Sequence, residues 1–280
     1  MFWLRAFSYL PFPVLYAFSD FCYFTLYHII RYRRKLVRHN LKVAFPEKLQ
    51  SELVTIERDF YRNLCDYGVE TIKLVSMSAA QISKRMVYKN PELVGQYAMR
   101  GESLLLLTSH QFNWEWLLAS GCLNLPLPVD FVYQQQSSRF FNDFSLFTRS
   151  RFGGFPVQRS EVARVAIRRK DIQRGIAIMA DQFPGHANDK KYWTQFLNQN
   201  TAFYEGIGQL AHLTQYRALF FGVRKLKRGY YEAEAVVVAE PPYEKGSSLI
   251  VEGYVKAVEK IIREQPAGWL WSHNRWKDRD

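Results

Sequence analysis

Short, continuous apolar runs are the feature that most constrains the fold of this chain. Residues 103–108 (SLLLLT) and 175–180 (GIAIMA) are too short for core helices and are typical of strands buried on both faces. Further strands are predicted at 129–133, 218–223 and 231–238. Helices are predicted at 51–75, 113–120 (with Gly121 as a stop signal), 139–151, 160–173, 204–215 and 247–264. This alternation predicts an α/β fold, with a central mixed sheet flanked by helices.

The N-terminal region combines an apolar run with a basic cluster. Residues 12–30 are long enough to cross about 30 Å of hydrocarbon, but Asp20 near the middle costs roughly 2.5–3.5 kcal/mol there. We therefore expect a helix that anchors in, or dips into, one leaflet, and no cleaved signal peptide. The alternative is an amphipathic helix packed on the protein's own core. The predicted division is 1–42 for the membrane anchor and its basic flank and 43–280 for one α/β domain. The flank consists of Arg31, Arg33, Arg34, Lys35, Arg38 and Lys42.

The charge balance points to an anionic partner. There are 38 Lys and Arg against 26 Asp and Glu, a formal net charge of +12, which suits nucleic acid, anionic lipid or a phosphorylated substrate. The sequence has no zinc-ligand spacing and no aromatic–basic motif of RNA-binding strands, so we expect no nucleic-acid partner. Its 3 cysteines are far apart and odd in number, which argues against a disulfide framework and favours a reducing compartment.

The segment from Ser109 to Glu115 (SHQFNWE) lies where a buried strand passes into a helix. Ligands of open α/β sheets bind at the carboxyl ends of strands. His110 and Glu115 can meet only if His110 lies in the turn and Glu115 in the first helical turns, because five residues on one helix separate side chains by about 140°. A neutral imidazole can take a proton from an attacking hydroxyl, and a carboxylate on its other nitrogen fixes the tautomer. A structural His and Glu would fit the same spacing.

Several motifs, in this order, resemble the lysophospholipid acyltransferase superfamily and, within it, the bacterial lipid A late (lauroyl/myristoyl) acyltransferases. The resemblance covers nearly the whole chain. The matching segments are Arg38-His39-Asn40-Leu41 with Phe45-Pro46, Thr108 to Glu115, Val132-Tyr133, Phe140-Phe141-Asn142, Arg151-Phe152-Gly153 with Arg159, Ala180-Asp181-Gln182-Phe183-Pro184-Gly185, Trp193 to Ala202, Pro266-Ala267-Gly268 and Trp269 to Lys277.

This resemblance implies a glycerolipid acyltransferase-like fold on the cytoplasmic face of a bacterial inner membrane. It implies acyl transfer from acyl carrier protein to a hydroxyl of a lipid A precursor, with no cofactor, no metal and no covalent acyl-enzyme. His110 would be the general base and Glu115 its orienting partner. Arg159 would bind an acceptor phosphate, which a guanidinium fork suits. Three further residues are placed with those that bind substrate or shape its site, namely Asn113, Asp181 and Gln182.

Some features leave alternatives open. Family members commonly carry an Arg after the position of Tyr133, and Gln134 stands here, which makes a lysophospholipid or lyso-amino-lipid acceptor plausible. A hydrolase is disfavoured because no Gly-x-Ser-x-Gly elbow occurs. A non-catalytic membrane-surface protein is the other rival. His186, His212 and His273 are expected to be structural. A basic face is expected either to be solvated or to bind the acidic carrier protein, and it comprises Arg164, Arg168, Arg169, Lys170 and Arg174.

Overall fold

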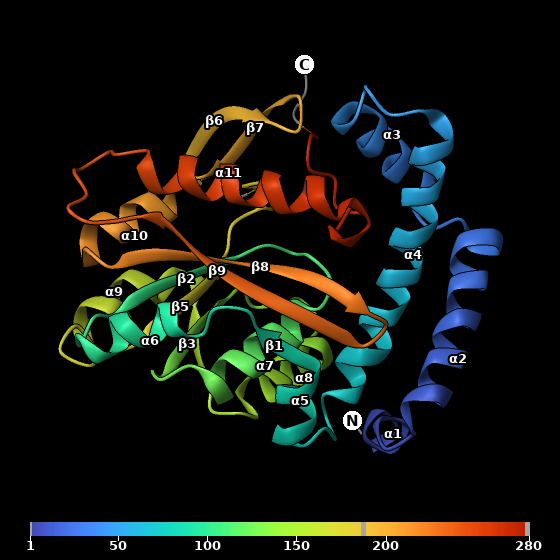
Figure 1. Cartoon of the computed structure of the whole chain (residues 1–280), viewed down its shortest axis with the longest axis horizontal. Helices are drawn as coiled ribbons and strands as arrows, with labels where there is room; N and C mark the ends of the chain where they lie inside the picture. The colour runs from blue at the N-terminus through green and yellow to red at the C-terminus, as the bar shows by residue number, and fades with distance from the viewer. Residues whose placement is uncertain (1, 186–188, 278–280) are drawn as a thin grey trace.

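A seven-stranded mixed sheet forms the centre of the protein, in a computed structural model that describes residues 2–185 and 189–277 (Figure 1). The strand order is β1-β9-β8-β2-β5-β3-β4. All strands from β8 to β4 are parallel, whereas β9 is antiparallel to β8. The strands are β1 (Met86–Tyr88), β2 (Leu104–Thr108), β3 (Val129–Tyr133), β4 (Phe155–Gln158), β5 (Gly175–Met179), β8 (Arg217–Lys227) and β9 (Tyr230–Ala239), and a separate hairpin contains β6 (Lys191–Phe196) and β7 (Gln199–Tyr204).

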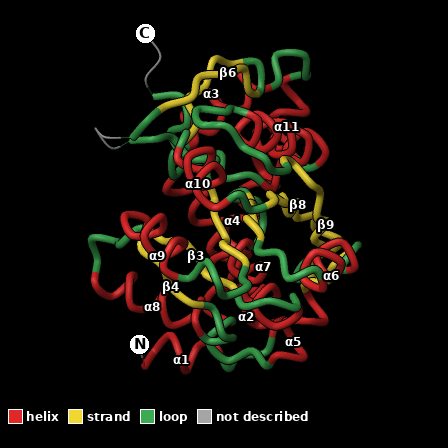
Figure 2. Tube along the Cα trace, turned by 90° about the vertical axis from the view of Figure 1, so that its left-hand side faces the viewer, coloured by secondary structure: helices red, strands yellow, loops and turns green. Residues whose placement is uncertain are grey.

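Helices cover both faces of the sheet, which explains why its central strand is apolar throughout (Figures 1 and 2). In β2, Leu105 and Leu107 join the core under α11, while Leu104 and Leu106 join the core under α7. The α/β prediction is therefore confirmed. The helices are α3 (Arg34–Ala44), α4 (Gln50–Lys73), α5 (Ala79–Arg85), α6 (Glu92–Met99), α7 (Trp114–Asn124), α8 (Arg139–Ser150), α9 (Val162–Arg168), α10 (Gly206–Thr214) and α11 (Leu249–Glu264).

The N-terminal apolar run is broken into pieces that lie against α4. They are α1 (Phe2–Ser8), α2 (Phe12–Phe24) and a π-helical turn, η1 (Thr25–Ile30). Among the described residues, no helix is both long and apolar enough to span a bilayer. Asp20, which disfavoured a span, forms an ion pair with Arg228. The inner face of α2 thus packs on the protein, as the alternative prediction had it, and the division at residue 42 falls inside α3.

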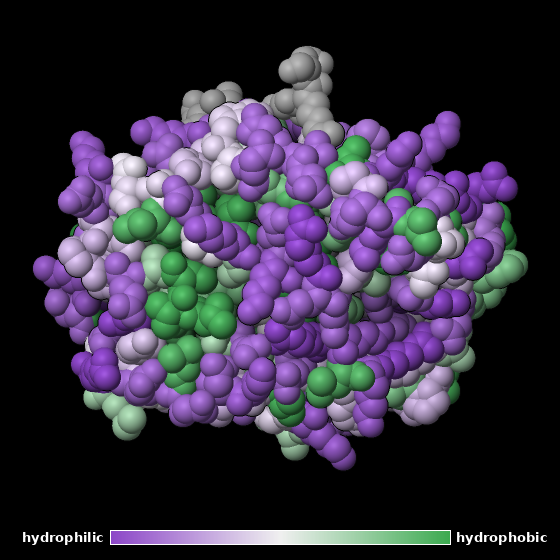
Figure 3. All heavy atoms as spheres, turned by 45° about the horizontal axis from the view of Figure 1, so that its top comes forward, coloured by the Kyte–Doolittle hydropathy of each residue, from purple (hydrophilic) through white to green (hydrophobic). Residues whose placement is uncertain are grey.

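The outer face of the same helices exposes large apolar side chains. Phe21 and Phe24 are 64% and 55% exposed, and Trp3 on α1 is 82% exposed. By contrast, the face that carries α11 and the β6–β7 hairpin is mostly hydrophilic, with smaller hydrophobic groups between the polar residues (Figure 3). Exposed aromatic side chains are therefore concentrated where the sequence predicts an interfacial anchor.

Element boundaries differ from prediction where tertiary contacts decide them. Gly121 does not end its helix, since α7 continues to Asn124, and a Cβ at Gly121 would lie 3.5 Å from the Tyr88 hydroxyl. The helix predicted at 160–173 is only α9, preceded by the 3₁₀ turn η2 (Arg159–Glu161). The edge strands β1 and β4 and the β6–β7 hairpin were not predicted, because their exposed positions remove the apolar signal.

Candidate active site

His110 lies in a tight turn between β2 and α7 that the C-terminal segment holds in place. Phe112 in this turn has φ 49°, a left-handed conformation that is unusual for a bulky residue. Its N–H donates to the Gly268 carbonyl at 2.8 Å, and the Leu270 N–H donates to the His110 carbonyl at 3.1 Å. A Cβ at Gly268 would lie 2.5 Å from the Phe112 ring, so only glycine fits there without a shift. The 3₁₀ turn η3 (Pro266–Gly268) therefore directly supports the turn that contains His110.

Asp181 is the carboxylate that hydrogen-bonds the His110 ring. Its Oδ1 lies 2.7 Å from His110 Nδ1, and its Oδ2 accepts the His110 backbone N–H at 2.9 Å and the Trp269 indole N–H at 2.8 Å. Asp181 follows β5, which pairs with β2 in parallel, so the two strand ends place the residues side by side. Asp181, and not Glu115, is therefore the carboxylate that orients the imidazole in this structure, which corrects the expectation for Glu115. The parallel pairing of β2 and β5 brings Asp181 to His110, although the two residues are far apart in the sequence.

The Asp181–His110 pair has the electrostatics of a proton acceptor and its anionic support. Burial alone would raise the pKa of Asp181, but the nearby His110, which also donates hydrogen bonds, and the Trp269 indole hold it at about 2. An ionised carboxylate on Nδ1 keeps the proton on that nitrogen and leaves Nε2 free to accept one. The His110 side chain is 16% exposed, so a substrate can reach it.

Glu115 is paired with Arg149 of α8 instead. The Arg149 Nε and Nη2 donate to Glu115 Oε2 and Oε1 at 2.9 and 2.6 Å, a bidentate ion pair. Burial would raise the pKa of Glu115, but the charge and hydrogen bonds of Arg149 lower it. His110 is near enough to add a smaller effect in the same direction. Glu115 is therefore in the first turn of α7 as predicted, close to His110 but bound to a different residue.

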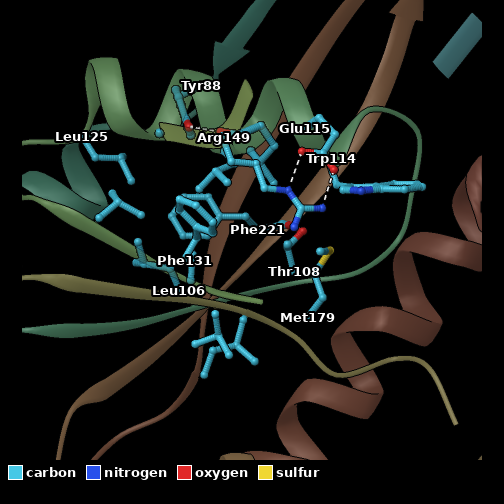
Figure 4. Close-up of a pocket in the computed structure, with 17 residues that line it drawn as sticks. Tyr88, Leu106, Thr108, Trp114, Glu115, Leu125, Phe131, Arg149, Met179 and Phe221 are labelled. Carbon is cyan, nitrogen blue, oxygen red and sulfur yellow. Dashed lines mark hydrogen bonds and ion pairs between the residues drawn. The ribbon is translucent and has the colours of Figure 1, made fainter. Parts of the chain in front are cut away.

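A narrow apolar pocket extends from this ion pair between α7 and the sheet (Figure 4). It contains about 620 Å³ of space not filled by atoms, counting its open part. Arg149, Glu115 and Trp114 lie at one end and Leu125 at the other (Figure 4). The Trp114 ring meets the His110 ring edge-on, with centroids 5.0 Å apart. The apolar walls of the pocket include Leu106, Phe131, Ala177, Phe221, Leu117, Leu118 and Gly121.

Arg159 reaches the same edge of the sheet but remains apart from His110. It follows β4, three strands from β2, which corresponds to roughly 14 Å between strand axes. Its guanidinium pairs with Asp189 and lies 4.6 Å from the centre of the Tyr204 ring. The side chain is 37% exposed, so it is accessible to an anion.

The other two predicted site residues, Gln182 and Asn113, differ in burial. Gln182 directly follows Asp181 and is half-buried. Asn113 is fully buried and caps α7, since its Oδ1 accepts the Trp116 N–H at 2.9 Å and its Nδ2 donates to Glu70 at 2.7 Å. With both ends of its amide bonded and no exposed surface, Asn113 has a structural role here, which corrects its placement among substrate-binding residues.

The remaining histidines and the basic face also differ in their contacts. His212 hydrogen-bonds the Tyr243 carbonyl at 2.8 Å, which fits a structural role. Burial, with the charge of Arg275, lowers the pKa of His273 to about 4. His186 lies outside the described residues. On the basic face Arg169 and Arg174 both pair with Asp130, which leaves Arg164, Arg168 and Lys170 exposed.

Arg149 and Trp269 are the site residues that sequence reasoning missed. Trp269 belongs to the closing motif, and its place there was the only signal for it. Arg149 had none, because its pairing with Glu115 depends on how α8 packs on α7. Within 2–185 and 189–277, no three His, Cys, Asp or Glu side chains are arranged to hold a metal ion.

A search of curated proteins found no match. A family model, described as bacterial lipid A biosynthesis acyltransferase, matches residues 1–278, which is almost the entire chain. The chain belongs to the bacterial lipid A biosynthesis acyltransferase family.

Proposed function

We propose that this protein transfers a fatty acyl chain from acyl carrier protein to a hydroxyl of a lipid A precursor, with His110 as general base. The observation that carries the proposal is the Asp181–His110 pair, whose imidazole packs edge-on against Trp114, a residue that lines the apolar pocket. An apolar pocket suits the hydrocarbon chain of an acyl group, and Trp114 connects this pocket with the imidazole that would deprotonate the acceptor hydroxyl.

The chemistry requires only proton transfer and one displacement. The acceptor hydroxyl gives its proton to His110 Nε2 as its oxygen attacks the thioester carbon. Asp181, ionised and buried at 1% exposure, stabilises the imidazolium that forms. The carbon–sulfur bond then breaks, and the imidazolium returns the proton to the departing carrier thiolate. An ester and a free carrier thiol result, and no covalent acyl-enzyme is needed.

Arg159 is proposed to bind an acceptor phosphate. It lies at the edge of the sheet where His110 is, and a guanidinium pairs with phosphate oxygens as it does with Asp189 here. An incoming phosphate would compete with Asp189 for the guanidinium. A lysophospholipid or lyso-amino-lipid is the alternative acceptor, and Gln134 in place of the family's Arg supports it.

The proposed site of action is the cytoplasmic face of the bacterial inner membrane. Exposed aromatic side chains on α1 and α2 are suited to the headgroup region, and exposed Arg31 and Arg33 follow them. Arg164, Arg168 and Lys170 form an exposed basic face for the acidic carrier protein. These side chains support the proposal through their chemistry and exposure.

Mass spectrometry of acylated products tests the function. The purified protein in detergent receives acyl carrier protein charged with mixed chains and a panel of lipid acceptors. Loss of His110 in His110→Ala should lower the rate by roughly 10²–10⁴-fold, as expected for a positioned general base. His39→Ala is the matched control, since His39 is exposed and outside the site.

The outcome separates the rival functions. Product on one acceptor that disappears in His110→Ala supports the enzyme and identifies the substrate. Free fatty acid without acylated lipid would instead identify a hydrolase. No turnover of any donor by the wild-type protein would contradict catalysis and favour a non-catalytic membrane-surface protein.

A further inference from the structure

Glu70 of α4 is a buried carboxylate outside the reacting groups, and it accepts hydrogen bonds from three parts of the chain. Tyr16 of α2 donates to its Oε1 at 2.8 Å. Asn113, in the turn after His110, and Tyr231 of β9 donate to its Oε2 at 2.7 and 2.8 Å. The side chain is 0% exposed. Burial raises its pKa to about 7 against the effect of these donors, so keeping this acid in the core is energetically unfavourable.

The bond to Asn113 connects Glu70 with the catalytic turn. Asn113 follows His110 by three residues and directly precedes Trp114 and Glu115. Its Oδ1 accepts the Trp116 N–H, one of the free N–H groups in the first turn of α7, while the Trp116 indole donates to the Glu70 carbonyl at 3.0 Å. Residue 70 therefore holds the start of α7 through both its side chain and its backbone.

The turn needs such external contacts because its backbone is unfavourable. Phe112 keeps a left-handed φ of 49° without being glycine, a conformation that persists only when surrounding contacts impose it. Gly268 restrains it from one side through the Phe112 N–H. Glu70 restrains it from the α4 side through Asn113, the residue that follows Phe112.

The bond to Tyr16 extends this support to the N-terminal helix. α2 runs along α4 (Figure 1). The contact is polar on its buried side, where Ser19 Oγ donates to Asp66 at 2.8 Å about one turn from the Tyr16–Glu70 bond. Lys73 of α4 donates to the carbonyls of Ser8 and Leu10 at 2.8 and 2.9 Å. A displacement of α2 therefore reaches Asn113 through a single carboxylate.

We propose that Glu70 is a positioning residue for the His110–Glu115 turn, and that through Tyr16 the helix α2 supports catalytic geometry. This inference rests on the proposed acyl transfer only for its kinetic consequence. It assigns the N-terminal segment a task in the active site that is separate from contact with a membrane.

Tyr16→Phe and Ser19→Ala provide a matched pair of tests. Each removes one hydroxyl from the inner face of α2 that donates to an acid of α4, but only Tyr16 reaches Glu70. Tyr16→Phe should lower kcat roughly three- to tenfold at unchanged KM, because that factor corresponds to the net free energy of one hydrogen bond. Ser19→Ala should leave kcat unchanged. Glu70→Gln should lower kcat by up to about 10²-fold, because a misplaced catalytic group is costly.

A double-mutant cycle distinguishes positioning from general stability. In a Glu70→Gln background, Tyr16→Phe should have little further effect on kcat, because the bond it removes acts through Glu70. Equal effects of Tyr16→Phe on kcat with and without Glu70 would overturn the link.

Amide hydrogen exchange gives a readout that does not depend on activity. Tyr16→Phe should increase exchange in residues 110–117, and Ser19→Ala should not. Increased exchange with no acyl transfer by the wild type would remove the proposed function and keep the structural link. Unchanged exchange at 110–117 in both variants would overturn the inference even in an active enzyme.

Discussion

Asp181 and Glu115 are both buried carboxylates near His110, with 1% and 5% exposure, yet they have different partners. Asp181 accepts hydrogen bonds from His110 and Trp269, neither of which is charged when the imidazole is neutral. Glu115 faces the guanidinium of Arg149, which already balances its charge. Only Asp181 therefore has a negative charge available to stabilise an imidazolium. The partner of a buried acid therefore indicates its role better than its distance from the base does.

The largest expected effect follows from removing the charge of Asp181. Asp181→Asn should lower kcat by roughly 10²–10⁴-fold, because an amide no longer keeps the proton on Nδ1 or stabilises the imidazolium. Glu115→Gln, measured as the rate per folded molecule, should lower kcat by less than about tenfold, since no direct support of His110 is lost. Steady-state kinetics with thermal unfolding as a control checks both. A larger loss of kcat in Glu115→Gln would reverse the assignment.

The next effect concerns stability and applies to Glu115. Glu115→Gln should lower the free energy of unfolding by about 3–5 kcal/mol, because Arg149 would remain buried without its counter-charge. Adding Arg149→Met should restore most of that loss, since an apolar side chain suits the pocket wall. Chemical denaturation measures all three proteins. If the double variant is no more stable than Glu115→Gln, the ion pair is not what holds α8 against α7.

The smallest expected effect is on how the free energy of unfolding depends on pH in the acidic range. The pKa of Asp181 is about 2 in the folded protein and near its ordinary value of 3.8 in the unfolded chain. The unfolded chain therefore binds the proton first as pH falls. The resulting stabilisation, about 2 kcal/mol, is complete above pH 4 and disappears between about pH 4 and pH 2.

Denaturation curves across that range provide the check. Asp181→Asn should flatten the dependence of stability on pH between about 4 and 2 relative to the wild type. The exposed Asp143→Asn is the control, since Asp143 is only in a surface pair with Arg139. A curve for Asp181→Asn that keeps the wild-type slope would show that Asp181 is not preferentially ionised in the folded state.

Buried elements of the fold were easier to predict from the sequence than exposed ones. Runs such as Leu104–Thr108 and Val129–Tyr133 were located closely because both faces of these strands are covered and most of their residues are apolar. In the hairpin Lys191–Tyr204, which forms a separate two-stranded sheet, β6 mostly alternates exposed and half-buried residues and so presents no continuous apolar run. Gly121 was misread as a helix stop because its local signal ignores what packs beside it.

The amino-acid sequence was sufficient to predict the α/β class, the location of His110 at a strand end and the membership that the family match confirms. These depend on local periodicity and on motif order, which a chain carries along its length. Chain packing was needed to reveal that Asp181 hydrogen-bonds His110, that Arg149 neutralises Glu115 and that Glu70 connects α2 with Asn113. Each of these contacts joins residues 34 to 71 positions apart, and strand order with helix packing selects such pairs from many acids and bases of equal local character.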